Sequence, residues 1–279
     1  MGFMAHTNKN GVRAGAAVIA SAVAVAATVW GVATLVEPGG AGAASRQNVS
    51  QSNGTDNSGH GRAGGPGQQP QGIPEGIAHA SESGGNTVNI TIDDGPDPRW
   101  TPKILDVLRE HDVKATFCMV GPRAKAHPDL VKKVVADGHR LCDHTMDHDT
   151  TMDKKPVDYQ ERQILDAKRL IEEAAGNGAK VEYYRAPGGA FTPESRRIAA
   201  ANGMRPLGWN VDTKDFQKPG TAAIVEAVKR EMGNGPTVLF HDGGGNRAQT
   251  VEALDQVLAW LRDQGRPTGF PVRTAPDTP

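Results

Sequence analysis

Residues 86–96, NTVNITIDDGP, decide the class of fold. Val88, Ile90 and Ile92 alternate with polar neighbours, a pattern that predicts a β-strand. From there to residue 265 the chain alternates between the two patterns, with helices predicted over 101–111, 123–136, 158–176, 192–203, 220–233 and 248–265 and strands over 113–121, 139–142, 181–184, 204–212 and 236–242. This alternation predicts an α/β fold with a parallel sheet covered by helices, of about six or seven units.

The beginning of the chain is an uncharged, apolar run from Ala14 to Val36, preceded by Lys9 and Arg13. Its length is sufficient to span a bilayer, which takes roughly 20 apolar residues. Positive charge before the run favours a cytoplasmic N-terminus, so we expect the rest of the chain to be extracytoplasmic. Residues 1–36 are either an uncleaved membrane anchor or a signal peptide cut near the small residues 41–43.

The remaining sequence divides into three parts by composition. Residues 37–85 are rich in Gly, Ser, Asn, Gln and Pro, and they predict a flexible linker because they offer little apolar surface to bury. Residues 86–266 form the globular domain, and residues 267–279 are a proline-containing tail expected to run over the surface. The net charge of −1 indicates no nucleic-acid partner, and the sequence fixes no oligomeric state.

Polar residues follow the predicted strands at the edge where parallel sheets form their active sites. Asp93 and Asp94 end the first strand, where Gly95 and Pro96 force a turn. Two adjacent carboxylates repel one another, and binding a cation relieves the repulsion. The alternative is an ordinary turn, since Asp-Gly and Gly-Pro are frequent turn dipeptides.

His144 and His148 follow the third strand in the sequence HTMDH. A spacing of four residues in a helical turn puts both imidazoles on one face, within reach of one metal ion. Together with Asp94 they provide three protein ligands and leave a position open for water. That combination predicts a hydrolytic metal site.

A second group of polar residues follows the later strands. His241 ends the strand over 236–242, and its ordinary pKa near 6.5 suits a proton donor or acceptor. Either Asp212 or Asp215 can orient it, as a carboxylate does in catalytic triads. Arg185 can hold a carboxylate by a bidentate contact, and the glycines after Pro187 bring backbone close to a ligand.

The segments TIDDGP, HTMDH, RAPGG, DTKDF and LFH resemble, in this order, the five motifs of the polysaccharide deacetylases. These form carbohydrate esterase family four, with the NodB homology domain, and the resemblance covers about residues 86–265. It implies a distorted (β/α)7 barrel and a bound Zn²⁺, with Co²⁺ as an alternative. It also implies an acetylated polysaccharide substrate, such as chitin oligomers, peptidoglycan N-acetylglucosamine or xylan.

The resemblance also implies roles for individual residues. The implied catalytic residues are Asp93 as general base, His241 as general acid, Asp215 as the partner of that histidine, and Arg185 as the residue that orients the base. The implied metal ligands are Asp94, His144 and His148, and the implied substrate-binding residues are Pro187, Leu239 and Phe216.

Two motifs depart from the family pattern. Phe216 stands where the fourth motif usually has Trp, and Ala186 and Gly188 replace a proline and an aromatic residue of the third. Both changes lie on the expected pocket wall and concern substrate preference more than chemistry. The reaction that we expect from the resemblance is N-deacetylation. The alternatives are an O-acetyl esterase acting on xylan and a non-catalytic carbohydrate-binding barrel.

Cys118 and Cys142 are predicted on successive strands, either as a disulfide or as two buried thiols.

Overall fold

The computed structural model describes residues 72–278. The predicted anchor or signal peptide, residues 1–36, and the linker up to residue 71 lie outside the described residues. Within residues 72–278 no helix is both long enough and apolar enough to cross a membrane.

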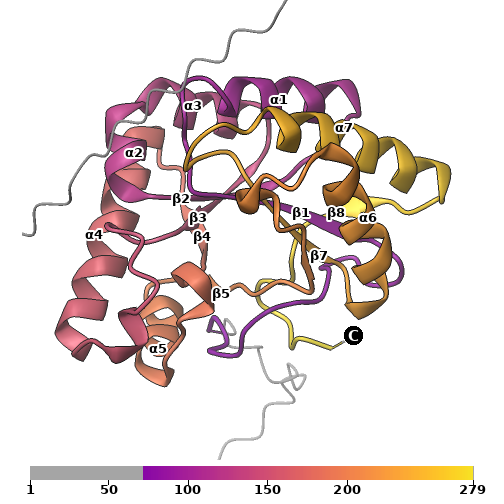
Figure 1. Ribbon diagram of the computed structural model, residues 1–279. Coiled ribbons are helices and arrows are strands. Elements are labelled where there is room, and N and C mark those ends of the chain that lie inside the picture. Colours follow the sequence, from indigo (N-terminus) through magenta and orange to yellow (C-terminus); the bar gives the residue numbers. More distant parts are fainter. Residues whose placement is uncertain (1–71, 279) are drawn as a thin grey trace, which may run out of the picture. The chain divides into compact units, whose positions relative to one another are not determined.

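The described chain forms a curved, parallel sheet with helices along its outer side (Figure 1). Strand β1 (Val88–Asp93) lies in the middle of the sheet. On one side follow β2 (Thr116–Met119), β3 (Arg140–Asp143), β4 (Val181–Tyr184) and β5 (Arg205–Pro206), and on the other β7 (Thr237–His241) and β6 (Val211–Asp212). The edge strands β5 and β6 are not paired with each other, so the sheet is a parallel half-barrel rather than a closed one.

The helices agree closely with the predicted pattern. They are α1 (Thr101–Glu110), α4 (Val157–Ala175), α5 (Pro193–Ala201), α6 (Thr221–Glu231) and α7 (Ala248–Asp263), with short 3₁₀ turns at η1 (Met152–Lys154), η2 (Pro187–Gly189), η3 (Asp215–Gln217) and η4 (Met232–Asn234). Thr192 caps α5 through a reciprocal hydrogen-bond pair with Ser195, a capping box that fixes where this helix begins.

One predicted helix and one predicted strand are each divided in two. The helix expected over 123–136 is α2 (Gly121–Ala126) followed by α3 (Pro128–Ala136), because Pro128 lacks an N–H and excludes helical geometry at His127. The strand expected over 204–212 is interrupted after Pro206, which cannot donate to a ladder. The chain crosses there from one edge of the sheet to the other.

Strand β1 is buried on both faces, although its sequence alternates. Its apolar residues pack with the helices in the main core, together with Ile104, Leu108 and other helical side chains. Its polar residues Asn89 and Thr91 face the interior of the half-barrel, where Asn89 donates to Thr237 Oγ1 (2.9 Å) and Thr91 to the Val238 carbonyl (2.7 Å). The side-chain donors of Asn89 and Thr91 are therefore paired, while Asn89 Oδ1 is buried without a hydrogen-bond partner among the described residues.

Two predicted boundaries are wrong, because both flanks of the domain pack against the sheet. Ala78, placed in the expected linker, is fully buried and forms a parallel bridge with Leu207. In the tail, β8 (Thr268–Gly269) pairs with β1, and Val272 is buried. The interior of an open half-barrel must be covered, and these two segments cover it with small and apolar side chains.

Cys118 and Cys142 are joined by a disulfide, which decides between the two alternatives left open by the sequence. They are register partners on β2 and β3 and belong to a buried interior cluster with Tyr183 and Leu207. The bond therefore connects two neighbouring strands beneath the loops that carry the polar motifs.

Reduction of this disulfide should lower the free energy of unfolding by about 3 kcal/mol, because it closes a loop with a sequence separation of 24. Chemical unfolding with and without a reductant measures the difference, and C118A/C142A is the matched variant that should show no effect of reductant. Two titratable thiols in the oxidised, denatured protein would contradict the assignment.

Candidate active site

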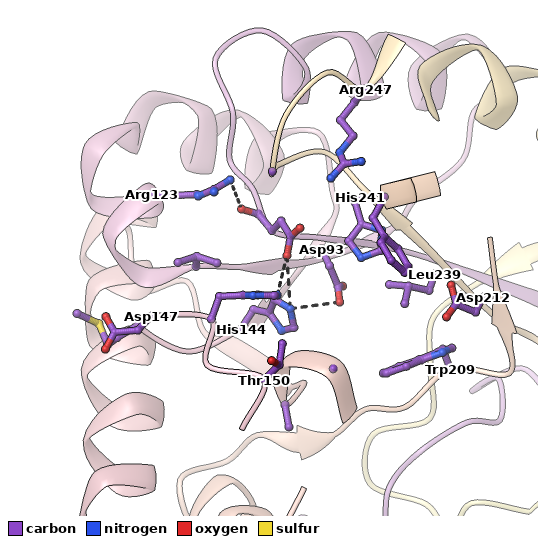
Figure 2. A pocket seen from close by; sticks show the side chains of 18 of the residues that line it. Asp93, Arg123, His144, Asp147, Thr150, Trp209, Asp212, Leu239, His241 and Arg247 are labelled. Carbon is purple, nitrogen blue, oxygen red and sulfur yellow. Dashed lines mark hydrogen bonds and ion pairs between the residues drawn. The ribbon is translucent and has the colours of Figure 1, made fainter. Parts of the chain in front are cut away.

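A pocket of about 860 Å³ opens at the carboxyl ends of the strands (Figure 2). Its lining contains most of the polar residues that the sequence singled out, drawn from β1, from the loops after β3 and β6, and from β7. Those residues are Asp93, Asp94, His144, His148, Asp212 and His241. The parallel sheet brings together motifs that lie far apart in the sequence.

Asp94, His144 and His148 form a cluster whose possible ligand atoms lie within 4.8 Å of one another. His148 Nε2 is 3.1 Å and His144 Nε2 is 3.7 Å from Asp94 Oδ1. The Nδ1 of His144 lies 2.8 Å from the Arg185 carbonyl, an acceptor that requires this nitrogen to carry the proton and leaves Nε2 with its lone pair outward. Two imidazoles and one carboxylate suit a divalent ion such as zinc.

The two histidines come together on an irregular loop and not on the helical turn that the spacing predicted. Thr145 and His148 have positive φ values of 67° and 53°, which are unfavourable for residues other than glycine. Hydrogen bonds stabilise this path, because Gln163 Oε1 on α4 accepts from the backbone N–H groups of Met146 (3.1 Å) and Asp147 (2.9 Å). The loop shape is thus imposed by α4.

The pKa shifts within the cluster bear on whether its side chains can bind a cation. Burial raises the pKa of Asp94, but the hydrogen bond from His148 and the nearby histidine charges outweigh it and hold the pKa well below its usual value. Burial lowers the pKa of His144 below 6.5, which favours the neutral, ligating form. The hydrogen bond to Asp94 raises the pKa of His148, so a proton competes with a metal ion there.

Asp93 is 2% exposed and is held by the buried guanidinium of Arg185. Arg185 Nη1 donates to Asp93 Oδ1 (2.7 Å) and to Thr91 Oγ1 (3.0 Å). The contact is not the bidentate one predicted from sequence, because Nε and Nη2 donate to the carbonyls of Leu207 and Gly208. Arg185 therefore fixes the carboxylate to the chain crossing between β5 and β6.

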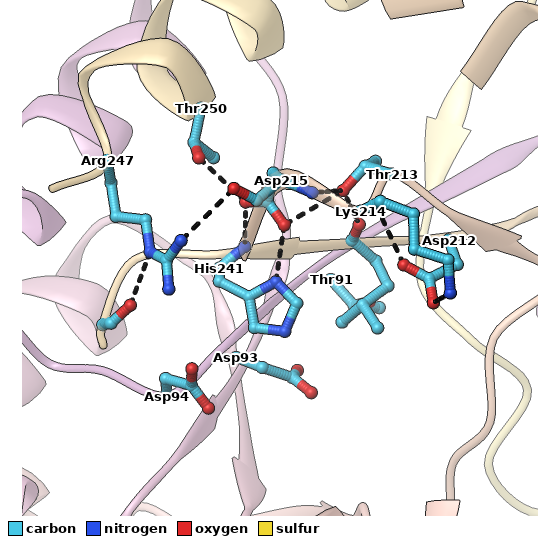
Figure 3. A network of polar contacts seen from close by, with 12 residues as sticks. Thr91, Asp93, Asp94, Asp212, Thr213, Lys214, Asp215, His241, Arg247 and Thr250 are labelled. Atoms are coloured by element: carbon cyan, nitrogen blue, oxygen red, sulfur yellow. Dashed lines mark hydrogen bonds and ion pairs between the residues drawn. The ribbon is translucent and has the colours of Figure 1, made fainter. Parts of the chain in front are cut away.

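His241 and Asp215 form a tight pair near Asp93 (Figure 3). His241 Nδ1 is 2.6 Å from Asp215 Oδ1, and the backbone N–H of His241 donates to Oδ2 (2.9 Å). Thr250 also donates to Oδ2 (2.8 Å). Burial lowers the pKa of His241, but the hydrogen bond and charge of Asp215, with the other nearby carboxylates, raise it to about 9. Asp212, the other candidate, pairs with Lys214 instead (2.6 Å).

Two of the three predicted substrate-binding residues line the pocket, and the third does not. Leu239 and Phe216 line it, and the Phe216 ring, 44% exposed, stands edge-on to the His241 ring at 5.5 Å between centroids. Pro187 is buried and does not line the pocket, whereas its neighbours Ala186 and Gly188 do. The η2 turn points the proline away and brings backbone to the pocket surface.

Several residues that line the pocket were not singled out from the sequence, among them Trp209, Arg123 and Arg247. Trp209 lay inside a predicted strand, and its ring is 5.6 Å from the Arg185 guanidinium. Arg123 begins a segment predicted only as a helix, and Arg247 precedes α7 outside every motif. No residue pattern distinguished these positions from ordinary surface ones.

Replacing Asp215 by Asn should bring the pKa of His241 down from about 9 toward 6.5. Since the raised pKa belongs to the folded state, the pair's stabilisation is full below about pH 6.5 and is lost as the pH rises through about 9. The native protein should lose stability across that window, and D215N should lose less. An NMR titration of the imidazole and unfolding curves at both ends measure this. D212N is the control, and an unchanged pKa in D215N would refute the assignment.

A family model described as polysaccharide deacetylase matches residues 80–207. A chitooligosaccharide deacetylase of Sinorhizobium fredii is 38% identical over 208 residues, which are 70% of this chain and 93% of the relative.

Solved structures of related proteins also match the fold of this chain. That of the Bc1960 peptidoglycan N-acetylglucosamine deacetylase matches with a TM-score of 0.64 and 30% identity, over 70% of this chain and 90% of that one. A pseudoenzyme of carbohydrate esterase family four from Bacillus anthracis matches with a TM-score of 0.61 and 31% identity, over 66% and 63%. The chain therefore belongs to the polysaccharide deacetylases, the metal-dependent hydrolases of carbohydrate esterase family four.

Proposed function

We propose that this protein removes N-acetyl groups from a polysaccharide built of 2-acetamido sugars. One observation carries the proposal: a single pocket holds a three-residue cluster suited to a metal ion, a buried carboxylate and a histidine whose pKa is raised to about 9. Acetamide hydrolysis needs an electrophile, a base and an acid together, and this pocket supplies a group for each.

Asp94, His144 and His148 are the residues that would hold the metal, and Zn²⁺ is our first choice, with Co²⁺ second. A divalent ion bound there polarises the acetyl carbonyl and makes water a better nucleophile. The outward Nε2 of His144 and the low pKa of Asp94 support this assignment.

Asp93 is the proposed general base. Its Oδ1 is occupied by Arg185, and its Oδ2 lies 3.6 Å from His144 Nε2, beside the ligand cluster. That position suits a carboxylate that takes a proton from the attacking water. Arg185 fixes its orientation.

His241 is the proposed general acid. With its pKa raised to about 9 it carries a proton at neutral pH, as an acid must. The departing sugar amine is a poor leaving group until its nitrogen is protonated, so a charged His241 supports amide hydrolysis. The products are acetate and a glucosamine unit.

Two substrates follow from the relatives: chitin oligomers and peptidoglycan N-acetylglucosamine. The O-acetyl esterase and the non-catalytic carbohydrate-binding barrel are the alternatives. The Bacillus anthracis neighbour is named as a pseudoenzyme, but in the present chain the residues proposed as acid, base and metal ligands line one pocket. Catalysis is therefore the better supported proposal.

Three variants test the proposed roles. H144A should lose bound zinc, whereas D93N and H241A should retain it and lower kcat by about 10²- to 10⁴-fold. Zinc content and acetate release are the two measurements. H127A, at a histidine outside the pocket, should change neither. Equal loss of zinc in all three site variants would overturn the division into ligands, base and acid.

Acetate release by the zinc-loaded protein from chitopentaose, purified peptidoglycan and acetylated xylan tests the reaction itself, with EDTA-treated protein as the control. Release from the amide substrates that EDTA abolishes is the expected result. Release from xylan alone would make the protein an esterase, and no release from any of the three would favour the carbohydrate-binding alternative.

We also propose that the protein acts outside the cytoplasm, delivered there by the apolar run from Ala14 to Val36. Cell fractionation should find the full-length protein in the membrane or a shortened form in the medium. N-terminal sequencing of a shortened form should give a start near residues 41–43. A protein found only in the cytoplasm would contradict this proposal.

A further inference from the structure

Two arginines of the pocket have no part in the reaction described above. Arg247 is only 2% exposed, yet its polar contacts are to backbone carbonyls: Nε donates to Gly243 (2.6 Å) and Nη1 to Asp215 (3.3 Å). Arg123 is half-buried, and its Nη1 donates to the Asp94 carbonyl (2.9 Å). Figure 2 shows both side chains directed at the pocket from different elements.

The acidic residues of the pocket already have partners of their own. These pairs are Asp93 with Arg185, Asp94 with His148, Asp212 with Lys214, and Asp147 with the Gln163 amide. Within residues 72–278, neither Arg123 nor Arg247 forms an ion pair with a carboxylate. Arg247 is thus withdrawn from water, and Arg123 partly so, with no carboxylate in an ion pair with either, which is unfavourable for the buried charge unless a ligand supplies an anion.

The loop after β7 brings these two cations close together. A Cβ atom added at Gly243 would collide with Arg123 Nη1, and one added at Gly244 would lie 3.0 Å from Arg247 Nη2 and 3.3 Å from Asp94 Oδ2. Both guanidinium groups therefore lie against the same pair of glycines, next to a proposed metal ligand. Glycine at these two positions lets both guanidinium groups approach the loop closely at the pocket wall.

We propose that Arg123 and Arg247 form a carboxylate-binding subsite next to the reacting acetamide. The substrate is then an acidic glycan of 2-acetamido sugars, such as peptidoglycan strands whose lactyl carboxylates are free because the stem peptides have been removed, and not the neutral chitin chain. Arginine suits this task because its planar fork of donors matches a carboxylate. The inference rests on the proposed N-deacetylase function, since it names the substrate class of the same site.

A matched substrate pair tests the subsite. Oligosaccharides from peptidoglycan, with free lactyl carboxylates, are compared with the same oligosaccharides after the carboxylates are converted to amides. Native protein should have a kcat/KM about tenfold or more higher for the acid form, since a hydrogen bond between charged groups contributes that much. R247Q and R123Q should each lower kcat/KM for the acid form by a larger factor than for the amidated form, so that the ratio of the two falls toward one.

Three controls keep the result interpretable. R262Q removes an exposed arginine from α7, far along the same helix, and should change neither rate. R247K keeps the charge without the fork and should recover part of the preference. Thermal unfolding shows whether each variant is folded, and R123Q, at the less buried position, carries the test if R247Q is not.

Binding to the metal-free protein gives a readout independent of catalysis. Calorimetry with the two oligosaccharides should show tighter binding of the acid form, lost in R123Q. Equal affinities, or variants that slow both substrates equally, would overturn the subsite while leaving the N-deacetylase intact. If native protein releases no acetate from any substrate, the proposed function fails, and calorimetry still decides whether a carboxylate is bound.

Discussion

Arg185 joins four parts of the chain inside the half-barrel. Its guanidinium contacts Asp93 and Thr91 on β1 and the carbonyls of Leu207 and Gly208, while its own carbonyl accepts from His144. A fully buried cation of this kind is tolerated only because each of its three nitrogens donates a hydrogen bond and its charge is matched by Asp93. The proposed base and the chain crossing between β5 and β6 contact its side chain, and a proposed metal ligand contacts its backbone, so all three depend on this one residue.

A polar interior makes this arrangement possible. Asn89, Thr91 and Asp93 follow one another along the inner face of β1, and all are buried. In such surroundings protonation states are set by partners and not by solvent. His144 is driven toward the neutral form by burial, whereas Asp215 holds His241 in the charged form. Two histidines a short distance apart are thereby suited to opposite tasks, ligation and proton donation.

The sequence predicted the order of strands and helices and the strand ends that carry Asp94, His148 and His241, because apolar periodicity and short motifs are local signals. It failed where the outcome depends on distant contacts. The path of the loop around His148 is set by Gln163 on α4, and the burial of Ala78 by a bridge to Leu207. Arg247 could not be distinguished, since its significance lies in having no carboxylate partner in the described fold, a property no local pattern records.

The pairing of β1 with β7 has a consequence for the order of synthesis. Asp93 is in register with His241, about 150 residues further along the chain, and β8, the other late partner of β1, comes later still. Strand β1 therefore leaves the ribosome long before two of its partners, β7 and β8, have been synthesised. Contacts so distant in sequence form slowly. The half-barrel can be completed only after nearly the whole domain has been synthesised, so a partly synthesised chain cannot yet bring Asp93 and His241 together.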